Sequence, residues 1–247
     1  MKKWFAYGTM FFCAYLLFMI ATAPAAAILN LVSLPKGLSL QGVSGSIWHT
    51  SIKQASQEQV QIQDIDIRLS VFSLLTLDPK ITLSFGGALT PGPEGQLSVS
   101  GLLAEAKIQD ADITLSANEI AQKLALPMPL EAHGLVNLQL NEFVIGKPLC
   151  QVASGHLSWP NAAVSAMEEK VSLGSFDAKV SCEQGALALT LDPENDLGLT
   201  FSAYLRQKGR VSGNGYLTPG AKFPEALKAV LPFIGKADNQ GRYRLSL

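Results

Sequence analysis

The fold is indicated most directly by residues 176–191, whose sequence is FDAKVSCEQGALALTL. In its first half, apolar Phe, Ala, Val and Cys alternate with polar Asp, Lys and Ser up to Cys182. After the polar turn Glu183–Gly185 the alternation resumes, with leucine at every second position up to Leu191. A period of two places the apolar side chains on one face of a β-strand, and a short polar turn with glycine joins two strands. The stretch therefore predicts a hairpin with one apolar face.

The same alternation continues over most of residues 36–247. It recurs at Ile65–Val71, Ile81–Phe85, Leu97–Leu103, Ile113–Leu115, Val136–Leu140, Leu197–Leu205 and Tyr243–Leu247. Short turns separate these segments and favour antiparallel neighbours, because parallel strands need long crossover connections. Short helices are predicted only at 118–126 and 224–231. We expect a mainly β fold in which a long curved antiparallel β-sheet hides its apolar face as a groove, a sandwich or a partly open barrel.

The composition excludes several classes of protein. Of the 247 residues, 48% are hydrophobic and 16% are charged, which rules out a disordered chain or a coiled coil and provides for a sizeable core. Lys and Arg number 19 against 20 Asp and Glu, so the formal charge is −1. Proteins that bind nucleic acid carry a basic surface, and we therefore expect no nucleic-acid partner.

The N-terminal segment is predicted to be a membrane anchor. No charged residue occurs from Trp4 to Pro35, a run of 32 residues, and a helix of about 20 apolar residues spans a bilayer. Lys2 and Lys3 precede the run, which places the N-terminus in the cytoplasm and everything after Lys36 on the other side of the membrane, which in a bacterium is the periplasm. The residues assigned to the anchor are Trp4, Tyr7, Phe11, Phe12, Leu16, Leu17, Phe18, Ile20, Ile28 and Leu29. The predicted organisation is residues 1–35 as cytoplasmic tip and single transmembrane helix, and 36–247 as a periplasmic β-rich domain.

A cleaved signal peptide is the alternative for this segment. Small residues at Ala21–Ala23 and Ala25–Ala27 could be cleavage sites. The apolar run is longer than that of a signal peptide and continues to Val32, which favours an uncleaved anchor. Pro24 is expected to kink or end the helix.

Two cysteines in the exported part are predicted to form a disulfide. Folding the chain back about Ala166 sets Cys150 opposite Cys182 and Val152 opposite Val180, and opposed Cβ atoms lie within bridging distance. Such a bridge stabilises the fold by about 3 to 4 kcal/mol. The alternative is a pair of reduced cysteines that fill space in the core.

The sequence contains no recognisable catalytic constellation. His49, His133 and His156 have no second ligand at helical spacing, so they do not predict a zinc site. The acidic segment Asp192–Asp196 lacks the glycine and the glutamate of an EF-hand loop. We therefore expect no catalytic residue, no cofactor and no metal, and interpret the chain as a binding or assembly protein and not an enzyme.

The segment that follows the anchor has the most individual sequence. Leu38–Trp48 runs from a strand into the pattern G-x-x-G-S-I-W, formed by Gly42, Gly45, Ser46, Ile47 and Trp48. Further points in order along the chain are Leu74-Leu75, the segment GHLSW at 155–159 between the cysteines, and DNQGRYRL at 238–245. In these features the chain resembles protein N of the bacterial type II secretion system, the GspN family, over essentially its full length.

This resemblance implies a function and a set of partners. It implies an inner-membrane component of the pathway that exports folded proteins from the periplasm across the outer membrane, with other secretion subunits of the inner membrane and periplasm, and membrane lipid, as partners. It also implies a distant similarity to AsmA-like proteins, whose sheets curl into apolar grooves. The alternative function is accordingly a periplasmic lipid-binding or lipid-transfer module.

Overall fold

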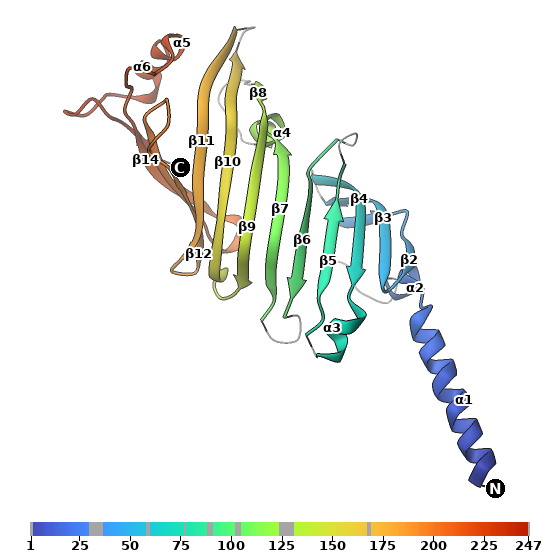
Figure 1. Ribbon diagram of the computed structural model, residues 1–247. Helices are drawn as coiled ribbons and strands as arrows, with labels where there is room; N and C mark the ends of the chain where they lie inside the picture. The colour runs from blue at the N-terminus through green and yellow to red at the C-terminus, as the bar shows by residue number, and fades with distance from the viewer. Residues whose placement is uncertain are drawn as a thin grey trace. The chain divides into compact units, whose positions relative to one another are not determined.

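The computed structural model shows a mainly antiparallel β protein with a few short helices (Figure 1). It describes residues 2–29, 37–57, 60–76, 78–87, 91–101, 105–123, 131–166 and 169–246. The chain forms two units, Met1–Pro91 and Gly92–Leu247. The predicted mainly β class is confirmed.

The first unit contains the N-terminal helices and a small sheet. Its elements are α1 Lys2–Ala21, α2 Ala25–Leu29, β1 Leu38–Gln41, β2 Ser44–Ser46, β3 His49–Gln57, β4 Val60–Leu69, α3 Val71–Leu75 and β5 Ile81–Phe85. The strand order is β1-β3-β4-β5, with β2 also paired to β3, and these pairings are antiparallel. Ile52, Ile65 and Phe85 are its largest buried apolar side chains.

The N-terminal apolar run is divided into two helices. The helix α1 has 20 residues and ends at Ala21, and α2 is a separate helix of 5 residues that begins after Pro24. Proline lacks the amide hydrogen that a continuing helix needs, which explains the break. Within the residues that the structure describes, no helix has both the length and the hydropathy needed to cross a bilayer. The transmembrane helix predicted for this run is therefore not supported.

The second unit contains the longer strands. Its elements are β6 Glu94–Ser100, β7 Lys107–Ser116, α4 Ala117–Lys123, β8 Glu131–His133, β9 Leu135–Ile145, β10 Cys150–Ala166, β11 Glu169–Glu183, β12 Ala186–Leu191, β13 Leu199–Leu205, η1 Gln207–Gly209, β14 Val211–Leu217, α5 Glu225–Lys228, α6 Leu231–Ile234 and β15 Tyr243–Ser246. The order is β6-β7-β9-β10-β11-β12-β13-β14-β15, with β8 also paired to β10. This order does not return on itself, so the sheet of the unit is open.

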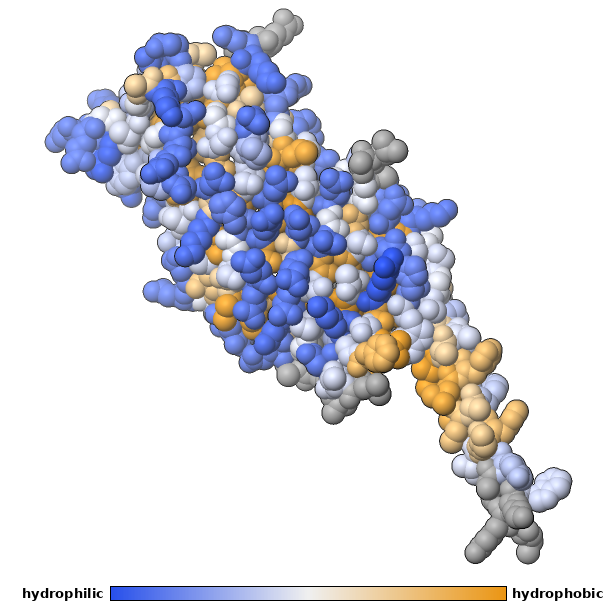
Figure 2. Space-filling model, viewed as in Figure 1, coloured by the Kyte–Doolittle hydropathy of each residue, from blue (hydrophilic) through white to orange (hydrophobic). Residues whose placement is uncertain are grey.

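The apolar face of this sheet is covered in two places by the short helices. Near one end, Ile120 of α4 packs against buried Ala132 and Val136. Elsewhere, Leu227 of α5 packs against a cluster that contains buried Leu173 and Phe176. Trp159 borders both clusters, and its ring lies 5.8 Å from that of Phe176. On the face drawn in Figure 2, hydrophilic side chains prevail over the strands, as expected for a sheet with one wet side.

Two bulges bend long strands of the second unit. Asp110 in β7 and Asn161 in β10 have positive φ angles of 51°. The β6–β7 pairing shifts register between Gln96 and Ser98, and the β10–β11 pairing shifts near Asn161. A bulge bends its strand and increases the local twist. The curvature predicted for the sheet therefore has identifiable residues behind it.

The helices differ in detail from the sequence predictions. The helix predicted at 118–126 is α4, and the part of that prediction after Lys123 lies outside the described residues. The helix predicted at 224–231 is two short helices, α5 and α6. The alternation places Val71 in a strand, but Val71 begins α3, because the hydroxyl of Ser70 caps the helix by accepting from the amide of Ser73.

Candidate interaction site

The G-x-x-G-S-I-W motif forms a tight turn and the short strand β2. Gly42 and Gly45 have φ angles of +66° and +91°, a region that favours glycine. A Cβ at Gly45 would overlap the backbone carbonyl of His49 on the paired strand β3. The hydroxyl of Thr50 donates to the carbonyl of Ser46 at 2.9 Å and closes the turn. The glycines are therefore needed for the close approach of β2 to β3.

The last two residues of the motif hold the N-terminal helix. The indole Nε1 of Trp48 donates to the carbonyl oxygen of Ile20, in the last turn of α1, at 3.2 Å. The amide of Ile47 donates to the carbonyl of Ala23 at 3.1 Å, and Ser46 forms an isolated bridge with Pro24. Helix ends leave carbonyls without intrahelical partners, and the motif supplies partners there. We call residues 42–48 with Ile20–Pro24 the helix clamp.

The residues assigned to the anchor lie on the two helices and are largely exposed. Exposed side chains are those of Trp4, Tyr7, Phe11, Phe12, Leu16, Leu17, Phe18, Ile20 and Ile28, whereas Leu29 is half-buried. Trp4 is 85% exposed and Phe11 76%. A helix that is apolar on all sides needs an apolar environment. The clamp thus joins an exposed apolar helix to the strands β2 and β3.

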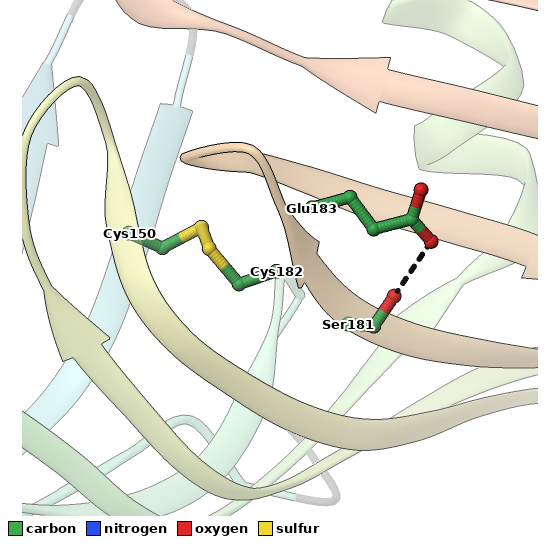
Figure 3. The surroundings of a disulfide bond; sticks show 4 residues. All are labelled: Cys150, Ser181, Cys182 and Glu183. Carbon is green, nitrogen blue, oxygen red and sulfur yellow. Dashed lines mark hydrogen bonds between the residues drawn. A yellow bond between two sulfur atoms is a disulfide. The ribbon is translucent and has the colours of Figure 1, made fainter.

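The predicted disulfide is present, but in a different setting (Figure 3). Cys150 and Cys182 are bonded, and their Cα atoms are 6.1 Å apart. The predicted register is wrong, since Gly155 faces Val180 and Val152 faces Val144 of β9. The β10–β11 hairpin reverses between Ala166 and Glu169 and not about Ala166, so Cys150 lies beyond the paired part of β11.

The bridge therefore joins two turns at one end of the sheet. The amides of Leu149 and Cys150 both donate to the carbonyl of Gly185, at 3.1 and 3.4 Å. Gly185 lies in the β11–β12 turn, and a Cβ there would overlap the ring of Pro148 in the β9–β10 turn. The disulfide, two hydrogen bonds and this close contact fix the two turns to each other.

The histidines have cross-strand partners that the sequence does not reveal. His49 bonds to Asp66 and His156 to Asp177, each at 3.0 Å, and both pairs are exposed. His133 Nε2 and Ser165 Oγ are 2.7 Å apart, but the carbonyl of His133 accepts from Trp159, so the residue is part of the packing of β8.

A serine beside a histidine is the minimum for nucleophilic catalysis, which also requires a group that orients the base. Across the described ranges, no carboxylate is recorded on the His133 ring, and no three His, Cys, Asp or Glu side chains gather as metal ligands.

The acidic segment at Asp192–Asp196 is used to shape a loop. Asp192 accepts from the amide of Glu194 at 2.9 Å, and Asp196 pairs with Lys222 at 3.4 Å. The side chain of Asn195 bonds twice to Leu199. These contacts turn the acidic groups toward the protein's own donors, which is the arrangement of a structured turn.

The C-terminal DNQGRYRL segment closes on Asp238. Its carboxylate accepts from the amides of Gln240 and Arg242 and from Nε of Arg242, all at 2.9 Å. The guanidinium of Arg242 also lies 4.6 Å from the ring centre of Tyr216. The pKa of Asp238 is lowered, and the hydrogen bond from the Arg242 amide is the largest cause. Partial desolvation raises the pKa, whereas the Gln240 amide and the Arg242 guanidinium lower it further. The turn directs β15 onto β14.

We expect this turn to open in acid. A depressed pKa in the folded state means that the ionised carboxylate stabilises the turn above the unfolded pKa of about 3.9, and that this is lost as the pH falls through the folded value. The amide resonances of Gln240 and Arg242, followed by NMR from pH 7 to pH 2, should move together in that acidic range. In an Asp238→Asn variant they should not titrate. Resonances that titrate alike in both proteins would contradict the assignment.

Comparison with known proteins agrees with the resemblance seen in the sequence. Residues 36–246 match the family model described as type II secretion system (T2SS), protein N. Type II secretion system protein N of Vibrio cholerae is 27% identical over 98% of this chain and 97% of its own length. The proteins of that name from Aeromonas hydrophila and Klebsiella pneumoniae are 29% and 30% identical, over 99% and 98% of this chain and 98% and 94% of their own. No solved structure matches. The chain belongs to the type II secretion system protein N family.

Proposed function

We propose that this chain is a non-enzymatic subunit of the type II secretion pathway that works at the inner membrane in the export of folded proteins across the outer membrane. The observation that carries the proposal is the helix clamp: the residues of the family motif hold the apolar N-terminal helix against the sheet through Trp48 and Ile47. Its partners are other secretion subunits, which contact residues near this clamp. A subunit that holds an apolar helix against a folded sheet is suited to assembly with other subunits at a membrane.

The N-terminal segment is proposed to hold the chain in the inner membrane. Its side chains are apolar and exposed, and Lys2 and Lys3 precede the run of uncharged residues from Trp4 to Pro35. Residues 36–247 then lie in the periplasm, an oxidising compartment in which a disulfide such as Cys150–Cys182 persists.

A fractionation experiment tests this topology. We expect the full chain to remain with membranes after alkaline carbonate extraction, with an intact N-terminus by sequencing, and a C-terminal tag to be digested by protease in spheroplasts. A variant that lacks residues 2–29 but carries a cleavable signal peptide should be released. A mature chain that begins after Ala23 or Ala27 and is fully soluble would contradict the anchor.

Site-specific crosslinking tests the docking role. A photoreactive amino acid at Gln41, which is exposed at the end of β1 beside the motif, should yield adducts with other secretion subunits in living cells. The same probe at Ser172, exposed on β11 of the second unit, is the control. Adducts of Gln41 with lipid alone would overturn the docking role.

Lipid binding is the second candidate function. On the apolar face of the second unit, Leu205 and Val211 face each other in register, and they are 36% and 58% exposed. An open sheet with exposed apolar side chains on one face can accept acyl chains. Mass spectrometry of gently extracted protein should detect stoichiometric phospholipid if this function is correct, and clean protein would exclude it.

A further inference from the structure

An open cleft lies at the end of the second unit where the turns meet, on the opposite face of the strands from the apolar one. Its volume is about 420 Å³, and its lining includes Pro148, Glu183, Ala186, Tyr204, Arg206 and Arg210. The cleft is outside the helix clamp and involves none of the family-motif residues. Its lining residues come from three connections and the strand residues beside them, namely β9–β10, β11–β12 and β13–β14.

Two arginines stand opposite each other in this cleft. Leu205 faces Val211 in the β13–β14 register, so the next pair outward is Arg206 and Arg210, and the amide of Arg206 donates to the carbonyl of Arg210 at 2.9 Å. Directly opposed side chains lie on the same face, and like charges in such positions repel each other. Lys208 at the tip of the hairpin adds a third positive charge.

Neither guanidinium has an acidic partner in the described part of the chain. The ion pairs recorded there are made by other residues. Glu183 lines the same cleft, but its carboxylate accepts from the hydroxyl of Ser181 at 3.3 Å (Figure 3) and lies outside ion-pair distance of both arginines. The repulsion between Arg206 and Arg210 is therefore left without compensation by the protein itself.

The floor of the cleft is a small side chain. Glu183 pairs with Ala186 across the β11–β12 turn, and the β12–β13 register, in which Leu187 faces Leu205, continues to Ala186 beside Arg206. Ala186 is 6% exposed. Because the side chain of Ala186 is only a methyl group between longer polar side chains, it leaves space that a ligand can enter. Across the strands the order is Glu183, then Ala186 at the floor, then Arg206 and Arg210.

The position of the basic hairpin is fixed from below. The side-chain amide of Gln207 donates to the carbonyl of Pro148 at 2.6 Å. Pro148 lies in the turn that the Cys150–Cys182 disulfide and the Gly185 hydrogen bonds hold. The hairpin tip is thus docked on a turn that a disulfide and two hydrogen bonds constrain, and a preorganised site binds a ligand at a lower entropic cost.

We propose that this cleft binds a phosphate group, held between Arg206 and Arg210 with the hydroxyl of Tyr204 as a further donor. A guanidinium forms two parallel hydrogen bonds to an oxyanion. One such fork satisfies the two oxygens of a planar carboxylate, whereas the tetrahedral oxygens of a phosphate, including the two non-bridging oxygens of a diester, can accept from guanidinium groups on two sides. The phosphate belongs to a phospholipid headgroup or to a soluble phosphate compound, which share this chemistry.

The test uses the purified full chain at fixed low salt with two phosphate probes. Isothermal titration measures binding of inorganic phosphate. Co-sedimentation compares phosphatidylglycerol vesicles, which carry a net negative charge, with phosphatidylcholine vesicles, whose choline neutralises the phosphate; the difference between them removes the association through the N-terminal helix that both share. The R206Q/R210Q double variant should lose at least tenfold in affinity. The matched control K170Q/K179Q removes two exposed charges from β11 and should stay within twofold of the parent. Arginine-to-lysine changes at both positions keep the charge and should lose part of the affinity.

The outcomes separate the sources and can overturn the proposal. Arginine-dependent binding of both probes with preference for vesicles indicates a lipid headgroup, and binding of inorganic phosphate alone indicates a soluble ligand. Phosphate should raise the melting temperature of the parent but not that of R206Q/R210Q. Without phosphate, the melting temperature of R206Q/R210Q should be no lower than that of the parent, because the double change removes a repulsion between two positive charges. Equal binding by R206Q/R210Q and the parent, no binding of either probe, or equally tight binding of a poly-glutamate peptide would overturn the phosphate site.

Discussion

Removal of the Cys150–Cys182 disulfide should lower the free energy of unfolding by about 3 to 4 kcal/mol. The bridge closes a loop with a sequence separation of 32 residues, and in the chain-entropy model a loop of this length restricts the unfolded chain by that amount. The effect should be large because the bridge also holds the two turns on which the basic hairpin rests. Urea unfolding of the Cys150→Ser/Cys182→Ser variant, compared with the parent, measures it.

A Cys13→Ser variant provides the control. Cys13 is the remaining cysteine, exposed on α1 and free, so its replacement should leave the unfolding midpoint within error of the parent. Addition of a reducing agent should destabilise Cys13→Ser as much as the parent. It should not change the stability of Cys150→Ser/Cys182→Ser, which has no disulfide to lose. A loss below about 1 kcal/mol in the double variant would contradict the loop-closure account.

Replacement of Gly45 by alanine should disrupt the helix clamp. At a φ of +91° an L side chain is strained, by about 1 to 2 kcal/mol, and the added Cβ would also overlap the carbonyl of His49. Both effects oppose the pairing of β2 with β3, which positions Ile47 and Trp48 for their bonds to the helix end. We expect a loss of stability above 2 kcal/mol, on the order of a buried steric conflict, measured by urea unfolding.

Gly37→Ala separates the two causes. Gly37 also has a positive φ, +84°, but among the described residues nothing lies within 4 Å of a Cβ built there. This variant should therefore show the conformational cost alone. Hydrogen exchange of the peptide that contains β2 should become faster in Gly45→Ala and remain as in the parent in Gly37→Ala. Similar exchange in all three proteins would mean that the close approach to His49 does not hold the clamp.

The strands could be predicted because their signal is local. Alternation of apolar and polar residues within segments such as 176–191 depends only on which side chains face the core, and the structure confirms β11 and β12 there. The cysteine pairing was also predictable, but its register was not, since it depends on where the chain reverses after Ala166. The alternation does not indicate the helix at Val71, whereas Ser70, which caps it, is a helix-start signal.

The two sites illustrate a different limit. The residues of the motif could be selected from the sequence, but the role of Trp48 depends on a contact with Ile20, 28 positions away. The sequence does not reveal the cleft, because Arg206 and Arg210 resemble ordinary charged residues of a loop. The two arginines face each other because the turn between them is centred on Lys208, and the sequence does not fix the centre of that turn. The position of Glu183 relative to the arginines depends on how β11 and β12 pair with β13, and residues 206–210 alone do not indicate it.

The pairing order described for the second unit has a consequence for how the chain acquires its structure. Strands from β9 to β15 each lie beside their neighbours in sequence, so contacts are short-ranged along the chain and loop closure is entropically inexpensive. Each newly emerging strand can add to the preceding one without waiting for the C-terminus. The topology therefore permits assembly strand by strand, and the Cys150–Cys182 bond requires the chain only as far as Cys182.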